Sequence, residues 1–204
     1  FASGAGRCIV SASAPDAILE IDIAARRVVG RTRLPAAVYG TNYTLGAATD
    51  LRRHYVANDL QLAHLNCAFP DSDGGIVVST LIQGDIGYLN SAGAYRVLGH
   101  GHIGCHGARA TADGDRLYFA DSCNGALVLL GPDGMERQRF AIDSRWLHDV
   151  QHVTGDLFLF CAADRNALDL IDIGTGRTLL SQRFDQRGGA VQFVNLHPAG
   201  EAVF

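Results

Sequence analysis

One pattern of about forty residues recurs along this chain of 204 residues and constrains its fold more than any other feature. Each copy has a short run of β-forming residues, a polar turn, and a second run in which apolar and polar residues alternate. The copies lie at residues 7–22, 76–90, 117–131 and 157–172, and the last three begin 41 and 40 residues apart. Such regular spacing indicates a repeat architecture.

Two more strand-like runs complete each copy. A third run follows through a turn, as in GAYRVL, GMERQRF and GRTLLSQRF, and Gly93, Gly134 or Gly176 stands where a tight turn needs a positive φ. A fourth run precedes three of the copies. Four strands in about 40 residues predict an all-β fold, a β-propeller with four-stranded antiparallel blades. The chain holds four to five blades, alone or as part of a larger propeller. A β-sandwich, the alternative, does not require so regular a period.

We expect a single propeller domain over residues 1–204. Its repeat units are at about 1–35, 54–98, 105–140 and 147–185, with a closing strand at 190–204. The first unit lacks an inner strand, so the run at 191–197 is expected to complete that blade and close the ring. The interval between the first two copies is longer than one period, and residues 35–62 make up the extra length. This segment is expected to be either a long loop over one face or a degenerate blade. Long loops in compact domains are often functional.

Charge and cysteine content limit the class of function. The net charge is −4 and all 17 basic residues are Arg, so we expect no nucleic-acid partner. We expect no membrane span either, because no apolar run approaches the roughly 20 residues that one needs. Five cysteines without C-x-x-C spacing indicate buried free thiols in a reducing, cytoplasmic compartment. A removed signal peptide stays an open alternative because the chain begins at Phe1. The oligomeric state stays open.

The blade pattern G-D-x-L-Y/F-x-x-D-x-x-x-x-x-L-x-x-(I/L)-D-x-x-x-G resembles propellers of the NHL, SMP-30/gluconolactonase and YVTN class. The pieces HLN (64–66), CHGAR (105–109) and WLHDV (146–150) are most similar to uncharacterised bacterial propellers that carry H-x-N and H-x-x-R blade motifs. This resemblance implies a propeller fold, which many different functions share. The acid-Asn-Asp metal set of the gluconolactonases has no match at the corresponding positions, so the resemblance does not favour lactonase activity.

Histidines give the sharpest chemical signal in the repeat. His64, His106, His148 and His197 occupy near-equivalent places in successive units, in or just before inner strands. Equivalent inner-strand positions of a propeller face one another around its central channel. Imidazole nitrogen suits Fe, Zn or Mn, so these four histidines are candidate ligands for a divalent transition metal at the channel mouth. The alternative is structural, with each ring hydrogen-bonded to a neighbouring turn.

Polar and aromatic residues accompany these histidines. Asn66, Arg109 and Trp146 are candidate substrate-binding residues, because Arg can clamp an anion with two hydrogen bonds and Trp can stack on a ring. Asp149 directly follows His148, and this pair is the candidate catalytic acid and base. Asp121 and Asp164 are expected to cap turns. The segment HGHIGCH at 100–106 is either a metal or substrate loop or an exposed connection between blades.

Two functions follow from these patterns. The first is a metal-assisted enzyme, a hydrolase, lyase or oxygenase, that acts on a small polar or anionic substrate at the channel mouth. The second is a non-catalytic propeller that binds a protein or glycan partner through its rim, with residues 35–62 as the contact surface. Serine-hydrolase chemistry has no support, because no serine lies in a G-x-S-x-G setting.

Overall fold

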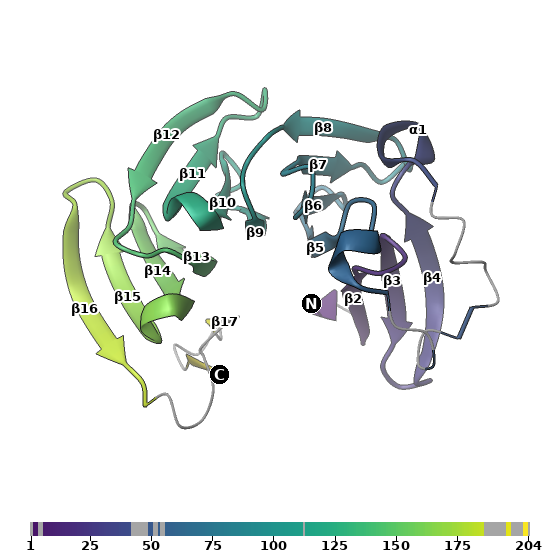
Figure 1. Cartoon of the computed structure of the whole chain (residues 1–204), viewed down its shortest axis with the longest axis horizontal. Coiled ribbons are helices and arrows are strands. Elements are labelled where there is room, and N and C mark those ends of the chain that lie inside the picture. The colour runs from purple at the N-terminus through teal and green to yellow at the C-terminus, as the bar shows by residue number, and fades with distance from the viewer. Residues whose placement is uncertain are drawn as a thin grey trace.

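The computed structural model describes residues 2–3, 6–41, 49–50, 53, 56–111, 113–185, 195–196 and 202–203. Four antiparallel sheets of four strands follow one another along the chain, and the strands of each sheet pair in chain order. The sheets stand side by side in an arc around a common centre (Figure 1). This arrangement confirms the predicted all-β propeller with four-stranded blades.

The blades are numbered in chain order. The first comprises β1 (Ala2–Ser3), β2 (Arg7–Ala12), β3 (Ala17–Asp22) and β4 (Arg27–Arg33). The second comprises β5 (Leu65–Pro70), β6 (Ile76–Thr80), β7 (Ile86–Leu89) and β8 (Tyr95–Gly99). The third comprises β9 (Cys105–Ala110), β10 (Leu117–Asp121), β11 (Ala126–Leu130) and β12 (Glu136–Ala141). The fourth comprises β13 (Leu147–Thr154), β14 (Leu157–Ala162), β15 (Ala167–Asp172) and β16 (Arg177–Arg183).

The repeat predicts where these strands begin. The second strands of the blades start at Arg7, Ile76, Leu117 and Leu157, the first residues of the four repeat copies. Gly93, Gly134 and Gly176 have φ of 83°, 80° and 71°, as the tight turns require. In the first blade, where the sequence departs from the pattern, Arg26 takes a left-handed conformation with φ of 51°.

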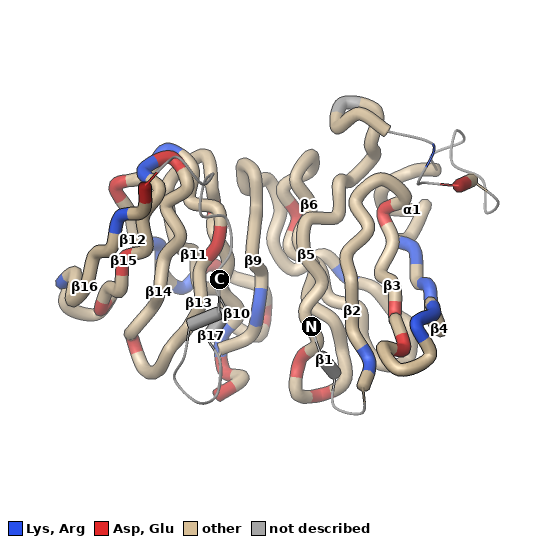
Figure 2. Tube along the Cα trace, turned by 90° about the horizontal axis from the view of Figure 1, so that it is seen from below, with Lys and Arg blue, Asp and Glu red and all other residues tan. Residues whose placement is uncertain are grey.

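Apolar side chains between neighbouring blades form the core. Tyr118 and Leu129 of the third blade pack with Phe158 and Phe160 of the fourth, and a similar cluster joins the second blade to the third. Burying one such side chain stabilises the fold by about 1.5–3 kcal/mol. Outer strands are exposed by comparison, and arginines follow β4 along its length (Figure 2). Charges on an edge strand oppose its pairing with another chain.

The first blade has an innermost strand that the repeat did not predict. Ala2 and Ser3 of β1 pair with Cys8 and Arg7 of β2. Of the run expected to close the ring, the structure describes only β17 (Asn195–Leu196), which pairs with β18 (Ala202–Val203) beside β13. The rest of that run lies outside the described residues, so closure of the ring stays a prediction.

The segment at 35–62 forms short helices where the structure describes it. These are α1 (Ala36–Tyr39) and the 3-10 helix η1 (Asn58–Leu60). Tyr39 is buried, and its hydroxyl donates to Asp85 at 3.0 Å, which fixes α1 to the second blade. The described parts of this segment therefore form a covering connection and contain no blade strand.

Two expectations from composition can be compared with the structure. All five cysteines are free thiols; Cys67, Cys105 and Cys161 are buried as expected, but Cys123 is exposed because it lies in the short turn after β10. Among the residues that the structure describes, no helix has the length and hydropathy that a membrane crossing requires.

Candidate functional site

A cavity of about 290 Å³ lies between β2 of the first blade and the inner strands β5, β9 and β13 of the other three. Four of the predicted site residues line it: Asn66 from β5, His106 and Arg109 from β9, and Asp149 from β13. Apolar and thiol side chains of β2 and β5 form the rest of the wall, including Ile9, Cys8, Cys67 and Phe69. The structure therefore brings together polar residues that the sequence places about 40 residues apart.

Strand register identifies which positions are equivalent. Leu65, Cys105 and Leu147 begin the inner strands and pair with Thr80, Asp121 and Ala162, the last residues of the second strands. The next residues along the chain are Asn66, His106 and His148; His106 pairs with Ala120, whereas Asn66 and His148 lie where the register shifts. His64 lies directly before β5, two residues ahead of the place that His106 takes in β9.

His106 is the most firmly held histidine of this set. It is 8% exposed, and its Nδ1 lies 2.7 Å from the carbonyl oxygen of Gly104 and 2.8 Å from Oγ of Ser122. A carbonyl can only accept a hydrogen bond, so Nδ1 carries the proton and Nε2 keeps its lone pair. Burial, followed by the nearby His148, lowers the pKa of His106 to about 4. The ring is therefore neutral at pH 7.

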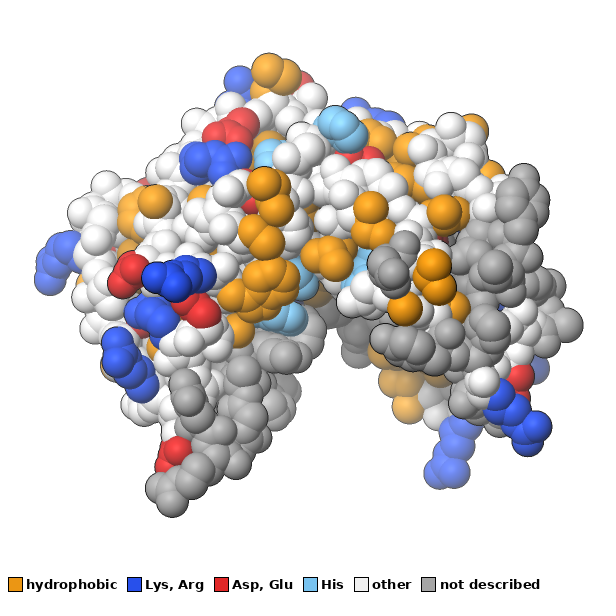
Figure 3. Space-filling view, viewed as in Figure 1, with side chains coloured by type: hydrophobic (Ala, Val, Ile, Leu, Met, Phe, Trp, Pro, Cys, Tyr) orange, Lys and Arg blue, Asp and Glu red, His pale blue; other side chains and the backbone are white. Residues whose placement is uncertain are grey.

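His148 and Trp146 lie against His106. The two imidazole rings have centroids 4.4 Å apart and planes tilted by 37°. The indole of Trp146 lies 5.5 Å from the His106 ring and 6.2 Å from the His148 ring. Histidine and hydrophobic side chains accordingly gather near the middle of one face of the molecule (Figure 3). This aromatic group lies beside the cavity, which His106 lines.

His64 lies near the same end with an unusual backbone. Its φ is 54°, and its Nδ1 is buried without a hydrogen-bond partner among the described residues. Burial lowers its pKa, and the carboxylate of Asp16 opposes that shift. Asp16 also accepts hydrogen bonds from the backbone of Ala63 at 3.0 Å and of Leu65 at 3.1 Å. Asp16 thus fixes the entry to β5 and the place of His64.

Arg109 and Asp149 form a buried ion pair in the cavity wall. Nη2 of Arg109 lies 3.1 Å from Asp149, and Nη1 donates to the carbonyl of Val150 at 2.8 Å and to Gln151 at 2.7 Å. The guanidinium also lies 4.2 Å from the ring centroid of Phe69. Arg109 therefore joins the second, third and fourth blades. The substrate-binding role of Arg109 and the catalytic role of Asp149 stay predictions.

The histidines of the segment at 100–106 do not converge. His100 pairs with the buried Asp85 and is largely exposed, whereas His102 packs edge-on against Phe119. Within the described ranges, no three or more His, Cys, Asp or Glu side chains are grouped so that they could hold a metal. His197 lies outside the described residues, so the four-histidine metal site stays a prediction.

Ser122 and Gly104 are the site residues that sequence reasoning missed. Both contact the ring of His106, yet neither belongs to a recognised motif. The available signal was the glycine ahead of Cys105, where a left-handed residue (φ of 70°) lets the backbone approach the histidine ring.

Comparisons with known proteins place this geometry among solved propellers. No protein-family model matches the sequence, and no curated protein sequence does either. The structure of virginiamycin B lyase from Staphylococcus aureus covers 99% of this chain and 60% of its own, with a TM-score of 0.67 and 12% identity. A catalytically inactive variant of that lyase with quinupristin covers 100% and 67%, with a TM-score of 0.65 and 12% identity.

A structure from outside the lyases has the same architecture. The nidogen/laminin complex covers 87% of this chain and 59% of its own, with a TM-score of 0.61 and 15% identity. The chain thus spans about three fifths of the length of these propellers. Identities this low show the fold alone. Sheet topology and structural similarity agree that this chain has the β-propeller fold, with four four-stranded blades in the part of the chain that the structure describes.

Proposed function

We propose that the channel mouth is an active site in which His106 and His148 exchange protons with a small polar substrate, as in a lyase or a hydrolase. The observation that carries this proposal is the pair of imidazoles with ring centroids 4.4 Å apart, of which His106 lines the cavity and His148 lies against it. One ring is fixed with Nε2 as an acceptor, and the other lies beside it. Acid–base catalysis needs such a positioned acceptor and donor.

The cavity suits a small ligand. Its volume of about 290 Å³ is near the lower end of the range of roughly 300–1,000 Å³ typical of small-molecule sites. Ile9 and Phe69 give one wall apolar character, while Asn66 and His106 supply polar groups to the other. Arg109 already binds Asp149 and two groups of the fourth blade, so the site favours a polar substrate over a strongly anionic one.

The similar lyase supports enzymatic use of this fold. Its catalytically inactive form carries a single replacement of histidine by alanine. A propeller of the same architecture can therefore depend on one imidazole. We extend only this idea to the present chain, and we use virginiamycin B as the first test substrate.

A divalent transition metal, Fe, Zn or Mn, is the cofactor that we propose as an alternative use of these rings, with His64, His106, His148 and His197 as its ligands. His197 lies outside the described residues, and the other three are not grouped so that they could hold a metal by themselves. His106 has the usual arrangement of a metal-binding histidine, because its other ring nitrogen is bonded to a backbone carbonyl. The buried Nδ1 of His64 without a described partner also fits a ligand. Such a metal would polarise a carbonyl or lower the pKa of bound water.

The test combines metal analysis with an activity screen. Purified protein is analysed for Fe, Zn and Mn, then incubated with virginiamycin B and a panel of small esters, and products are detected by mass spectrometry. We expect turnover to fall at least about 100-fold in His106→Ala. The control His100→Ala, which alters an exposed ring away from the cavity, should retain full turnover. Absence of product from every substrate would overturn the enzyme proposal, and absence of a stoichiometric metal would overturn the cofactor.

Binding of a protein partner is the second candidate function. Exposed apolar side chains stand in η1 and in the loops after β6 and before β9: Leu60 is 66% exposed, Ile82 is 47% exposed and Ile103 is 55% exposed. The fold similarity to the nidogen/laminin complex favours a contact through such a rim. If this reading holds, Ile82→Asp with Ile103→Asp abolishes capture of the partner, whereas His106→Ala leaves it unchanged.

A further inference from the structure

The central cavity is lined mainly by apolar side chains and free thiols. Ile9 and Val10 of β2 and Phe69 of β5 belong to its described lining, together with Cys8 and Cys67. Both cysteines are free thiols, and a free thiol behaves as a small hydrophobic group. Binding is therefore favoured when an apolar arm of the ligand leaves water and covers these side chains.

Two charged side chains stand in the described lining of the cavity, and they bind each other. Nη2 of Arg109 lies 3.1 Å from Asp149, and its Nη1 donates to the side chain of Gln151 at 2.7 Å. Both charged residues are buried, and the guanidinium carbon lies 4.2 Å from the ring centroid of Phe69. An ionic ligand would therefore lose its hydration without meeting an unpaired opposite charge in this lining.

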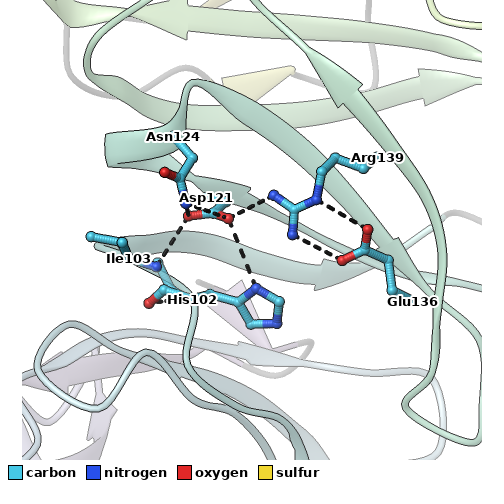
Figure 4. Close-up of polar contacts among 7 residues, drawn as sticks. His102, Ile103, Asp121, Asn124, Glu136 and Arg139 are labelled. Carbon is cyan, nitrogen blue, oxygen red and sulfur yellow. Dashed lines mark hydrogen bonds and ion pairs between the residues drawn. The ribbon is translucent and has the colours of Figure 1, made fainter.

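A similar ion pair lies outside the cavity, in the third blade. Asp121 at the end of β10 is buried, and its carboxylate accepts hydrogen bonds from the backbone N–H of Ile103 at 3.1 Å and from Asn124 at 3.1 Å. Arg139 donates to the same carboxylate at 2.7 Å and is itself bonded to Glu136 at 2.8 Å (Figure 4). Asp121 is absent from the described lining of the cavity, so this pair provides a matched control for the ion pair in the cavity wall.

From this lining we infer that the ligand of the cavity is a small uncharged molecule with an apolar arm, such as an amide or ester of a short alkyl chain. Asn66 and His106 lie in the same lining and supply polar groups for the amide or ester end. The volume of about 290 Å³ corresponds to roughly ten groups of the size of a water molecule, which is the size of an acetamide with an arm of about six carbons. The inference rests on the proposed function only in taking this ligand as the substrate.

Binding of N-alkylacetamides of increasing arm length tests the inference without any need for turnover. The protein is labelled with carbon-13 at its isoleucine methyl groups, and each amide is titrated while NMR follows Ile9 of the cavity and Ile23, which is 53% exposed. Affinity should rise about fourfold for each added CH₂ group. It should level off near about six carbons, where the cavity is full. The methyl signals of Ile9 should shift on binding, whereas those of Ile23 should not.

Charge is tested with two ions that carry the same arm. Heptanoate and hexylammonium should each bind at least about tenfold more weakly than N-hexylacetamide, because the described lining holds no unpaired opposite charge for them. Asp149→Asn removes the negative partner of Arg109, so heptanoate should then bind at least about tenfold more tightly while N-hexylacetamide changes little. Asp121→Asn is the matched control: it also removes a buried carboxylate from an arginine, but outside the cavity, and should leave heptanoate binding unchanged.

The outcomes separate this inference from the proposed function. Affinity that does not depend on arm length, or an ion that binds as tightly as N-hexylacetamide, would overturn the ligand class; these two measurements use the unaltered chain and decide the matter even if Asp149→Asn does not fold. An unchanged heptanoate affinity in folded Asp149→Asn, or an equal gain in Asp121→Asn, would overturn it too. If the amides bind as expected but no amide or ester is converted, the proposed activity fails and the ligand class stands. Turnover of ionic substrates alone gives the opposite result.

Discussion

The third and fourth blades use the same backbone turn for different purposes. Each has a 3-10 helix between its second and third strands, η2 (Ser122–Asn124) and η3 (Ala163–Arg165), followed by a left-handed residue. In the third blade the turn forms hydrogen bonds with the loop that enters β9, at Ile103, and with the ring of His106. In the fourth, Asp164 likewise binds the loop that enters β13, through the hydroxyl of Ser144 and the backbone of Arg145, but Ala163 stands where the third blade has Ser122. The repeated backbone fixes the fold, and the side chains on it decide which histidine is anchored.

The largest effect should come from the contact that joins these two blades. Arg109→Ala leaves Asp149 buried without its cation, so the free energy of unfolding should fall by about 3–5 kcal/mol. Replacing both partners, with Arg109→Met and Asp149→Leu, should restore much of the lost free energy of unfolding. Urea unfolding measures that free energy for the single and the double variant. A loss below about 1 kcal/mol in Arg109→Ala would show that the ion pair does not hold the blades together.

The left-handed residue after each turn gives the next comparison. A Cβ at Gly125 would lie 2.1 Å from the carbonyl oxygen of Ser144, and φ there is 57°. Gly125→Ala should therefore destabilise by about 3 kcal/mol. Asn166 stands at the equivalent position of the fourth blade and has a φ of 50°, which asparagine tolerates. Asn166→Gly should lower the free energy of unfolding by only about 1 kcal/mol, because it removes the hydrogen bond to the Phe184 carbonyl. Equal losses in urea unfolding would contradict this difference between the turns.

Acid should reveal the buried state of His106. The pKa of His106 is lowered to about 4 in the folded chain from an ordinary 6.5, so the unfolded chain binds more protons between these values. The free energy of unfolding should therefore fall by about 2 kcal/mol from pH 7 to pH 5 through this residue. His106→Gln should remove most of that fall. Urea unfolding at the two pH values measures it, and an unchanged slope in His106→Gln would refute the assignment.

Local sequence patterns predict most of the fold but only part of the candidate site. Strand positions follow from alternation and turn residues, which are local, so β6, β10 and β14 begin where the repeat predicts. His64 lies two residues ahead of the place that His106 takes in its inner strand, and counting residues along the repeat cannot reveal that offset. Asn66 takes that place in β5.

Contacts that depend on tertiary packing could not be derived from the sequence. Ser122 meets His106 only because the loop before β9 folds back on the turn after β10. Asp149 follows His148 in sequence, which suggested that it orients that ring. In the structure it faces Arg109, 40 positions away, because alternate strand residues point to opposite sides.

The most direct test of the account is the protonation state and tautomer of His106 in the unaltered chain. Nitrogen-15 NMR of histidine-labelled protein at pH 5.5 reports both. The account predicts a neutral ring with its proton on Nδ1, because burial and the Gly104 carbonyl impose that state. A charged ring, or a neutral ring protonated on Nε2, would contradict it and would remove the acceptor on which the proposed active site depends.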